Sequence, residues 1–336
     1  MTLSESHPFR AVTPLLRSVS LSERCGRPVY LKMENMRPSG SFKCRGIGEL
    51  LTREHQKGKR EAVSSSGGNA GFATATVGKA LGWKVTVVVP ESTPEMMRNK
   101  ISSVGATVHV HGANWNAADQ LARQLCAEHG AVYVPPFDEP VLWEGHASLV
   151  TEVAHVRPAL VVCAVGGGGL LGGVVTGCSK LPQKPLVVAA ETCGAHSFNL
   201  AWMSGADGTG EPPALPAITS VAKSLGALAV SRGVLRMCRD YAAKPHDQSN
   251  SESHDPRVHS VVVSDSDAIR AVAAFLEEER CLVEPSCGAA LACLYDETHR
   301  QSLLRLITAT EPESNDYSEK APIIVVVCGG HVYFSH

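Results

Sequence analysis

The sequence predicts an α/β protein in which helices cover parallel strands, and two observations indicate this class. From residue 62 onward, short apolar runs rich in Val and Ile alternate with longer amphipathic stretches, as expected when helices cover both faces of a sheet. In addition, glycine-rich turns at residues 64–71 and 166–173 each join a short strand to the start of a helix. The chain of 336 residues is long enough for two domains.

In chain order, the expected strands and helices alternate. The strands are expected at residues 84–89, 107–110, 160–165, 186–190, 258–263 and 323–327. The helices are expected at residues 69–81, 94–104, 114–129, 170–178 and 266–279, and several begin at Asn, Ser or Pro and end near Gly. Residues 245–256 are polar with almost no apolar side chains, which predicts a mobile surface loop.

Charge and cysteine content argue against several classes of protein. The chain has 31 basic and 33 acidic residues, and the basic residues form no long run, so we expect no nucleic acid partner. The N-terminus lacks the pattern of a secretory signal, and the uncharged segment 158–179 contains four successive glycines that a lipid-exposed helix would not tolerate. The eleven cysteines form no Cys-x-x-Cys pair. We therefore expect a cytoplasmic protein with reduced thiols and no membrane span.

The segment SGSFKCRG at residues 39–46 places Lys43 at the start of an expected helix, directly after small residues. An amine at a helix N-terminus lies at the positive end of the backbone dipole, which disfavours protonation and leaves more free amine to attack an aldehyde. The alternative is a solvated lysine on an ordinary helix that Ser41 caps. Lys43 is therefore a candidate Schiff-base lysine.

The four glycines at residues 166–169 follow an expected strand and precede an expected helix. Bare backbone amides and a helix N-terminus together favour a phosphate group. A P-loop is excluded because no Gly-Lys-Ser/Thr follows. However, Gly167, Gly169 and Gly172 also fit the dinucleotide pattern Gly-x-Gly-x-x-Gly, and Glu191 lies roughly 20 residues further on, where a ribose-binding acid is expected. A nicotinamide oxidoreductase and a purely packing role of the glycines both remain open.

The second turn, SSSGGNAG at residues 64–71, offers hydroxyl groups, bare amides and the Asn69 side chain at one helix N-terminus. This set suits a carboxylate better than a pyrophosphate. A nicotinamide enzyme has no evident need for a nucleophilic lysine, a carboxylate turn and a phosphate turn together. An aldehyde cofactor that carries a phosphate and receives an amino acid needs all three. The combination therefore favours pyridoxal 5'-phosphate (PLP).

With these motifs, the chain resembles the serine/threonine dehydratase family of PLP enzymes, which have the fold of the tryptophan synthase β subunit (fold type II). The resemblance extends from Pro14 to Gly330. It rests on eight segments in the family's order, at residues 39–46, 65–71, 143–148, 166–169, 191–197, 220–226, 284–290 and 328–330.

The resemblance implies two three-layer α/β/α domains with PLP in the cleft between them. The large domain would be discontinuous, with residues 1–44 and 141–336, and the small domain, residues 45–140, would carry the substrate loop. A homodimer is the family's expected state.

Site residues are implied in the same way. Lys43 would be the catalytic residue and form the Schiff base with PLP, and Phe42 would pack beside the cofactor. The other implied cofactor contacts are Asn69, Gly166, Gly167, Gly168, Gly169, Leu170 and Cys328, the last facing the pyridine nitrogen. The loop that receives the substrate carboxylate would consist of Ser66, Gly67, Gly68 and Asn69.

The implied activity is elimination of water from L-serine or L-threonine, which gives pyruvate or 2-oxobutanoate plus ammonia. Serine racemases share the lysine motif, but they carry an acid/base serine at the position of Gly67, and glycine cannot move a proton. A racemase-like enzyme and a catalytically weak relative remain alternatives. In particular, the family continues after Gly330 with a Ser/Asn-rich turn and a helix, where this chain reads HVYFSH, and we expect this to weaken cofactor binding.

A cation site is also implied. Racemases place a second acid where this chain has Ser197, which leaves Glu191 as the only carboxylate. One carboxylate with carbonyl oxygens suits a monovalent ion such as potassium better than magnesium. The implied ligands are Gly166, Glu191, Ala195, Ser197, Leu225 and Ala227. The alternative for Glu191 is a solvated acid at the end of a strand.

Overall fold

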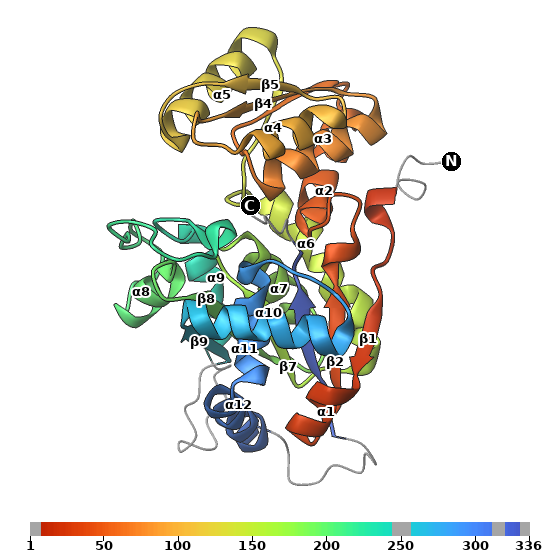
Figure 1. The fold of residues 1–336 in the computed structure, drawn as a ribbon, viewed down its shortest axis with the longest axis vertical. Helices are drawn as coiled ribbons and strands as arrows, with labels where there is room; N and C mark the ends of the chain where they lie inside the picture. The colour runs from red at the N-terminus through yellow and green to blue at the C-terminus, as the bar shows by residue number, and fades with distance from the viewer. Residues whose placement is uncertain (1–7, 244–256, 311–319, 330–336) are drawn as a thin grey trace. The chain divides into compact units, whose positions relative to one another are not determined.

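The structure is a computed structural model that describes residues 8–243, 257–310 and 320–329 (Figure 1). Every strand and helix predicted above is present, with ends that differ by at most two residues. The predicted mobile loop 245–256 and the divergent segment 331–336 lie outside the described residues.

The chain divides into two compact units, each built around its own sheet. The first unit comprises Met1–Val12 and Asn35–His146, and the second comprises Thr13–Glu34 and Ala147–His336. Residues 35–44, which include Lys43, therefore belong to the smaller unit in this division. The domain boundaries implied by the family resemblance stay a prediction.

The first unit contains a parallel sheet of four strands in the order β5-β4-β3-β6. The strands are β3 (Glu61–Ser64), β4 (Lys84–Val89), β5 (Thr107–Val110) and β6 (Val132–Val134). The helices are η1 (Pro8–Arg10), η2 (Glu34–Met36), α2 (Lys43–Gln56), α3 (Asn69–Leu81), α4 (Glu95–Ser103), α5 (Trp115–His129) and the first part of α6 (Pro140–Val153).

This first sheet has helices on both faces. On β4, Val88 packs in one hydrophobic cluster with Ala118 and Ala122 of α5. The neighbouring Val87 instead lies against α3, within 3.0 Å of the position that a Cβ of Gly71 would take. Because successive side chains of a strand point to opposite faces, α3 and α5 cover opposite faces. The first unit thus has the three layers that the predicted fold class requires.

The second unit contains a six-stranded sheet in the order β1-β2-β10-β7-β8-β9. Its strands are β1 (Leu15–Ser18), β2 (Val29–Met33), β7 (Leu160–Ala164), β8 (Leu186–Thr192), β9 (Val258–Val263) and β10 (Ile323–Val327). All pairs are parallel except β1 with β2. The sequence did not predict β1, because this edge strand has four residues with two exposed positions and no continuous apolar run.

Helices of the second unit are α1 (Val19–Cys25), η3 (Ala154–Val156), α7 (Gly169–Ser179), α8 (Ser197–Met203), η4 (Lys223–Leu225), α9 (Arg232–Ala242), α10 (Asp265–Glu279), α11 (Pro285–Tyr295) and α12 (Glu297–Thr310). Helix α11 packs on β7, β8, β9 and β10, and α10 packs on α11. Nine of the eleven residues of α11 are buried, which is expected for a helix that is apolar all round and lies inside a domain.

The order of strands in the second unit brings several candidate residues to one edge of the sheet. Strand β7 lies between β10 and β8 and runs parallel to both. Strand β7 leads into the glycine turn, β10 leads into Cys328, and β8 carries Glu191 near its carboxyl end. In α/β proteins this edge is where ligands bind.

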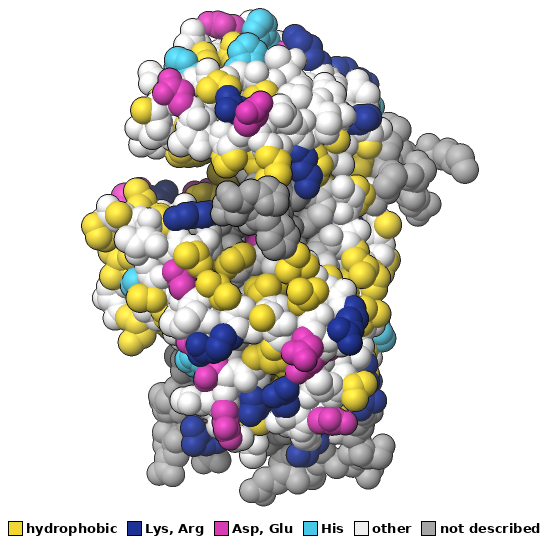
Figure 2. Space-filling view, viewed as in Figure 1, with side chains coloured by type: hydrophobic (Ala, Val, Ile, Leu, Met, Phe, Trp, Pro, Cys, Tyr) yellow, Lys and Arg dark blue, Asp and Glu magenta, His cyan; other side chains and the backbone are white. Residues whose placement is uncertain are grey.

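Charged side chains of both signs are interspersed on the face shown in Figure 2, in agreement with the net charge of -2. Among the described residues, we find no helix that is both long enough and apolar enough to cross a membrane.

Candidate functional site

Lys43 is the first residue of α2, and Phe42 is its N-cap. The Lys43 side chain is half-buried, its Nζ donates a hydrogen bond to the carbonyl oxygen of Pro136, and it lies 5.1 Å from the centroid of the Phe42 ring. Ser41 does not cap the helix, because its buried Oγ has no hydrogen-bond partner. The interpretation of Lys43 as a solvated lysine on a helix capped by Ser41 is therefore wrong.

His146 of α6 supports the start of this lysine helix. Its Nδ1 accepts a hydrogen bond of 3.1 Å from the backbone N–H of Gly46, and its ring meets the Phe42 ring edge-on at a centroid distance of 4.9 Å. Burial, followed by the positive charge of Lys43 and of two arginines, lowers the pKa of His146 well below its ordinary value. The imidazole is thus neutral, as its role as an acceptor requires. His146 lies in segment 143–148, one of the eight that carry the family resemblance, but the sequence by itself assigns it no function.

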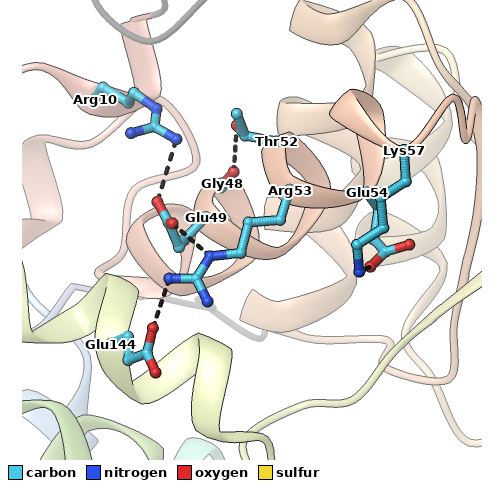
Figure 3. A network of polar contacts seen from close by, with 8 residues as sticks. All are labelled: Arg10, Gly48, Glu49, Thr52, Arg53, Glu54, Lys57 and Glu144. Atoms are coloured by element: carbon cyan, nitrogen blue, oxygen red, sulfur yellow. Dashed lines mark hydrogen bonds and ion pairs between the residues drawn. The ribbon is translucent and has the colours of Figure 1, made fainter.

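Further along α2, an ion-pair network holds the helix to its neighbours (Figure 3). Glu49 accepts from Arg10 at 3.2 Å and from Arg53 at 2.8 Å, and Arg53 also pairs with Glu144 of α6 at 2.5 Å. These side chains are partly exposed, so the network contributes modestly to stability.

The serine-rich turn lies between β3 and α3. Ser66, Gly67, Gly68 and Asn69 are half-exposed, and Gly68 is the N-cap of α3, which has no side-chain capping bond. A Cβ on Gly71 would lie 1.7 Å from the carbonyl oxygen of Ser66, so only glycine allows the helix to start this close to the turn.

Thr93 occupies the space beside Gly67. A Cβ at Gly67 would lie 2.7 Å from both Cγ2 and Oγ1 of Thr93. The sequence has no serine at position 67, and in this structure a side chain there would require Thr93 to move. Only the tertiary structure identifies Thr93, because nothing in the sequence links it to the turn.

The serine-rich turn is joined to a polar cluster that no sequence motif indicated, in which Ser65 and Asp119 are buried and Arg123 is exposed. The Ser65 hydroxyl donates to Oδ1 of Asp119 at 2.7 Å, and the Tyr133 hydroxyl donates to the same oxygen. Arg123 Nε donates to Oδ2 of Asp119 at 2.8 Å. Burial by itself raises the pKa of Asp119, but the hydrogen bonds from Tyr133, Ser65 and Arg123 outweigh it and the pKa is lowered. The only signal in the sequence is the four-residue spacing of Asp119 and Arg123 on a helix.

The glycine turn in the second unit leaves little space for side chains at Gly166 and Gly168. Gly168 has a φ of +100° and is the N-cap of α7, and a Cβ there would lie 3.1 Å from both Val230 and Val234. A Cβ on Gly166 would lie 3.0 Å from Cα of Leu225. Helix α7 begins without a side-chain cap, whereas α1, α5, α9 and α10 are capped by Ser18, Asn114, Ser231 and Ser264.

A bare helix N-terminus behind a glycine turn fits a phosphate group, because its amides have no side-chain acceptor. Helices α2, α3, α4 and α11 also begin without a side-chain cap, so the missing cap by itself does not mark a ligand site. The residues at the turn are nevertheless compatible with the phosphate of PLP.

Cys328 directly follows β10 and is 5% exposed. A hydrogen bond with the Cys287 thiol, followed by burial, raises the pKa of Cys328 well above its ordinary value. The group is a neutral thiol, which can exchange a weak hydrogen bond with a ring nitrogen but cannot hold it protonated by charge.

Glu191 is completely buried at the end of β8, and its carboxylate accepts N–H groups of Phe198 at 2.8 Å and Asn199 at 2.7 Å in the first turn of α8. Burial raises its pKa to about 8, although these hydrogen bonds oppose the shift. The Oγ of Ser197 is buried without a partner. The interpretation of Glu191 as a solvated acid is thus wrong. In the described part of the chain, no group of three or more His, Cys, Asp or Glu side chains is placed so that it could hold a metal ion.

Comparison with known proteins decides between the two cofactors that the glycine turn allows. The profile of a family described as pyridoxal-phosphate dependent enzyme matches residues 7–305. The chain belongs to this family of pyridoxal-phosphate dependent enzymes. The choice of PLP over a nicotinamide dinucleotide is therefore confirmed.

Individual members of the pyridoxal-phosphate dependent enzymes match nearly the whole chain. The human protein named serine dehydratase-like is 44% identical over 332 residues, which cover 98% of this chain and 92% of the relative. Human L-serine dehydratase/L-threonine deaminase is 39% identical over 333 residues, with coverage of 98% and 93%. The crystal structure of a fungal L-serine ammonia-lyase from Rhizomucor miehei superposes with a TM-score of 0.79 at 33% identity, covering 96% of this chain and 94% of that one. These matches confirm the resemblance and the predicted fold.

Proposed function

We propose that this pyridoxal-phosphate dependent enzyme is an L-serine/L-threonine dehydratase, an ammonia-lyase that eliminates water from the substrate. Hydrolysis of the resulting unsaturated amino acid then consumes one water and gives pyruvate or 2-oxobutanoate plus ammonia. The names of its relatives support this proposal. Within the chain, the deciding observation is that Thr93 fills the space beside Gly67. One face of the substrate thus lacks the acid/base that racemisation needs, whereas elimination can proceed with a single base.

In this proposal, Lys43 would hold the cofactor through its side-chain amine, and the same amine would remove the Cα proton of the bound amino acid. Bound PLP supplies the electron withdrawal that makes this proton acidic. Phe42 packs beside the cofactor and is itself held by His146. Asn69 is proposed to lie near the ring oxygen. The bare amides of Gly166, Gly167, Gly168, Gly169 and Leu170 hold the phosphate, and Cys328 faces the pyridine nitrogen as a neutral thiol.

The substrate carboxylate is proposed to bind at the start of α3. The binding residues are Ser66, Gly67, Gly68 and Asn69. The absence of a side-chain cap from the N-cap residue Gly68 of α3 supports this assignment. The lysine and the serine-rich turn belong to the first unit, and the glycine turn belongs to the second.

A potassium ion is proposed to bind at Glu191. The proposed ligands are Gly166, Glu191, Ala195, Ser197, Leu225 and Ala227. A buried carboxylate with a raised pKa beside the unpartnered hydroxyl of Ser197 supports a cation here, because a cation would offset the cost of burying the charge. Gly166 and Leu225, two of the proposed potassium ligands, also lie close together, which supports their assignment to one site.

We further propose a cytoplasmic homodimer. The structure contains no disulfide among the residues it describes, and eight of the eleven cysteine side chains are buried, which is typical of a reducing compartment. On α10, Ile269 and Leu276 are 50% and 42% exposed and lie seven residues apart on one face of the helix. A second copy could cover this apolar face.

The proposed function is tested by incubating the purified protein with PLP and either L-serine or L-threonine and measuring the 2-oxo acid with a coupled dehydrogenase. D-serine is measured in the same samples. A visible absorption band that borohydride removes, with the added mass on the peptide containing Lys43, would show covalent cofactor binding independently of turnover. Cofactor binding without any 2-oxo acid would leave the catalytically weak relative as the alternative, and D-serine as the main product would overturn the dehydratase.

A further inference from the structure

The buried cluster around Asp119 joins three elements of the first unit at the base of the serine-rich turn. Asp119 comes from α5, Ser65 follows β3, and Tyr133 belongs to β6. Ser65 is fully buried and Asp119 is 9% exposed, so water competes little for these hydrogen bonds. Arg123 completes the cluster, with its guanidinium carbon 4.1 Å from the centroid of the Tyr133 ring.

A carboxylate determines the direction of these bonds. An ionised carboxylate only accepts hydrogen bonds, so Ser65, Tyr133 and Arg123 must all donate to Asp119. The Ser65 hydroxyl thereby has one orientation. Such charge-assisted bonds are roughly twice as strong as neutral ones.

Ser65 directly precedes the half-exposed residues 66–69. Its hydrogen bond to Asp119 therefore fixes the N-terminal end of this stretch. At the other end, the first turn of α3 reaches so close to the carbonyl oxygen of Ser66 that residue 71 must be glycine. Within the turn, the N–H of Gly68 donates a bond of 3.3 Å to Ser66 Oγ, and the carbonyl oxygen of Gly68 accepts the N–H of Phe72 at 3.1 Å. Ser65 adds a hydrogen bond to a different helix, because its hydroxyl donates to Asp119 of α5, and this bond restrains the start of the turn.

We propose that Asp119 is a positioning residue, which orders residues 66–69 through the Ser65 hydroxyl and thereby sets the affinity for the carboxylate of the amino-acid substrate. This inference rests on the proposed function, because it assumes that these residues receive the substrate carboxylate. Asp119 itself does not touch the substrate and acts only through Ser65.

The test compares Asp119→Leu, Asp119→Asn and Ser65→Ala with the unmodified protein, all loaded with PLP. Asp119→Leu removes the acceptor, and we expect KM for L-serine to rise on the order of tenfold while kcat changes by less than about twofold. Asp119→Asn keeps an acceptor oxygen and the size of the side chain, so KM should rise less. Ser65→Ala should raise KM for L-serine. Adding Asp119→Leu to this variant should raise KM little further, because Asp119 acts only through Ser65.

A second readout is amide hydrogen exchange of residues 66–71 without substrate, measured by mass spectrometry. In Asp119→Leu these amides should exchange faster, while the peptide that contains the glycine turn is unchanged.

Asp267→Leu is the matched control for Asp119→Leu. Asp267 also accepts a serine hydroxyl, that of Ser264 at 2.6 Å, and pairs with an arginine, Arg270, but it caps α10 in the second unit. It should lower Tm without changing KM or exchange at residues 66–71. A rise in KM in this control equal to that in Asp119→Leu would reduce the role of Asp119 to general stability and overturn the inference.

The inference is also overturned if exchange at residues 66–71 does not change in Asp119→Leu, or if it rises while KM stays constant. If the unmodified protein forms no 2-oxo acid, the proposed function fails by itself. The positioning role is then judged by exchange alone, with faster exchange in Asp119→Leu supporting it and unchanged exchange overturning it.

Discussion

The serine-rich turn at residues 64–71 and the glycine turn at residues 166–169 both join a parallel strand to a helix without a side-chain cap, but they are held in different ways. The glycine turn consists of backbone alone, and its shape follows from a positive φ at Gly168 and from side chains such as Val230 that leave no room for a Cβ. The serine-rich turn is braced by the side chain of Ser65, which is hydrogen-bonded to Asp119 of a later helix.

This difference suits the proposed ligands. A phosphate that stays bound through every turnover needs a rigid set of amides, which tight packing against the backbone of the turn provides. A substrate carboxylate enters and leaves in each cycle, and its affinity can be adjusted by residues that brace the turn from behind. The comparison also explains why Gly166–Gly169 stand out in the sequence, whereas Asp119 does not.

The largest expected effect comes from Lys43→Ala, which changes neither turn. Without the amine that binds the cofactor and removes the Cα proton, kcat should fall by at least about 10³-fold, and the visible absorption of the covalent cofactor should disappear. Tm without cofactor should remain close to that of the unmodified protein. Retention of the visible band on another lysine would contradict the assignment of Lys43.

The two turns should respond differently to a single added methyl group. Gly71→Ala places a Cβ into the carbonyl of Ser66 and should cost about 3 kcal/mol of unfolding free energy and weaken L-serine binding. Gly168→Ala forces an alanine to a φ of +100° and should cost about 1–3 kcal/mol and weaken PLP binding instead.

Denaturant unfolding and titration of the visible band measure these two effects. Gly82→Ala is the control, since Gly82 also has a positive φ of +69° but no atom lies within 4 Å of its Cβ position. Equal losses of PLP affinity in both turn variants would show that the turns do not have separate ligands.

At Gly67, the structure predicts a steric block that a second change can relieve. Gly67→Ser should lower kcat/KM for L-serine on the order of tenfold, because its side chain overlaps Thr93, and adding Thr93→Ala should restore most of the loss. Kinetics of both single variants and the double variant measure the coupling. Full activity of Gly67→Ser alone would show that Thr93 does not limit the space.

Stability should depend on pH and potassium through Glu191. Its folded-state pKa of about 8 is higher than the ordinary value of 4.5, so the protonated form favours folding. This contribution is complete below the ordinary value and is lost as pH rises through 8. Potassium at the carboxylate should oppose the loss and raise Tm by a few degrees at pH 8 relative to choline chloride. Glu191→Gln should remove both the pH dependence and the potassium effect, and an unchanged response would contradict the cation site.

The smallest effect is expected away from both turns, in the ion-pair network of α2 (Figure 3). Arg53→Ala removes two partly exposed ion pairs and should lower the unfolding free energy by less than about 1 kcal/mol. Glu144→Gln, which removes one of them, should have a smaller effect. Neither variant should change KM, and a change in KM would show that the outer half of α2 contributes to substrate binding.

Local patterns in the sequence determined much of this protein. The apolar strands of the parallel sheets, the helix that begins at Lys43 and the two glycine-rich turns are each contained in a few consecutive residues, because strand and helix periodicity and backbone freedom are local properties. The same segments carry the family resemblance, and with it the cofactor and the fold.

Only the tertiary structure decided how these turns are supported. Asp119 reaches Ser65 across 54 residues, His146 reaches Gly46 across 100, and Thr93 meets Gly67 from the loop before another helix. It also revealed β1, whose antiparallel pairing with β2 places it at an edge, and the complete burial of Glu191. These features depend on which elements the fold packs against each other, and no spacing along the chain encodes that directly.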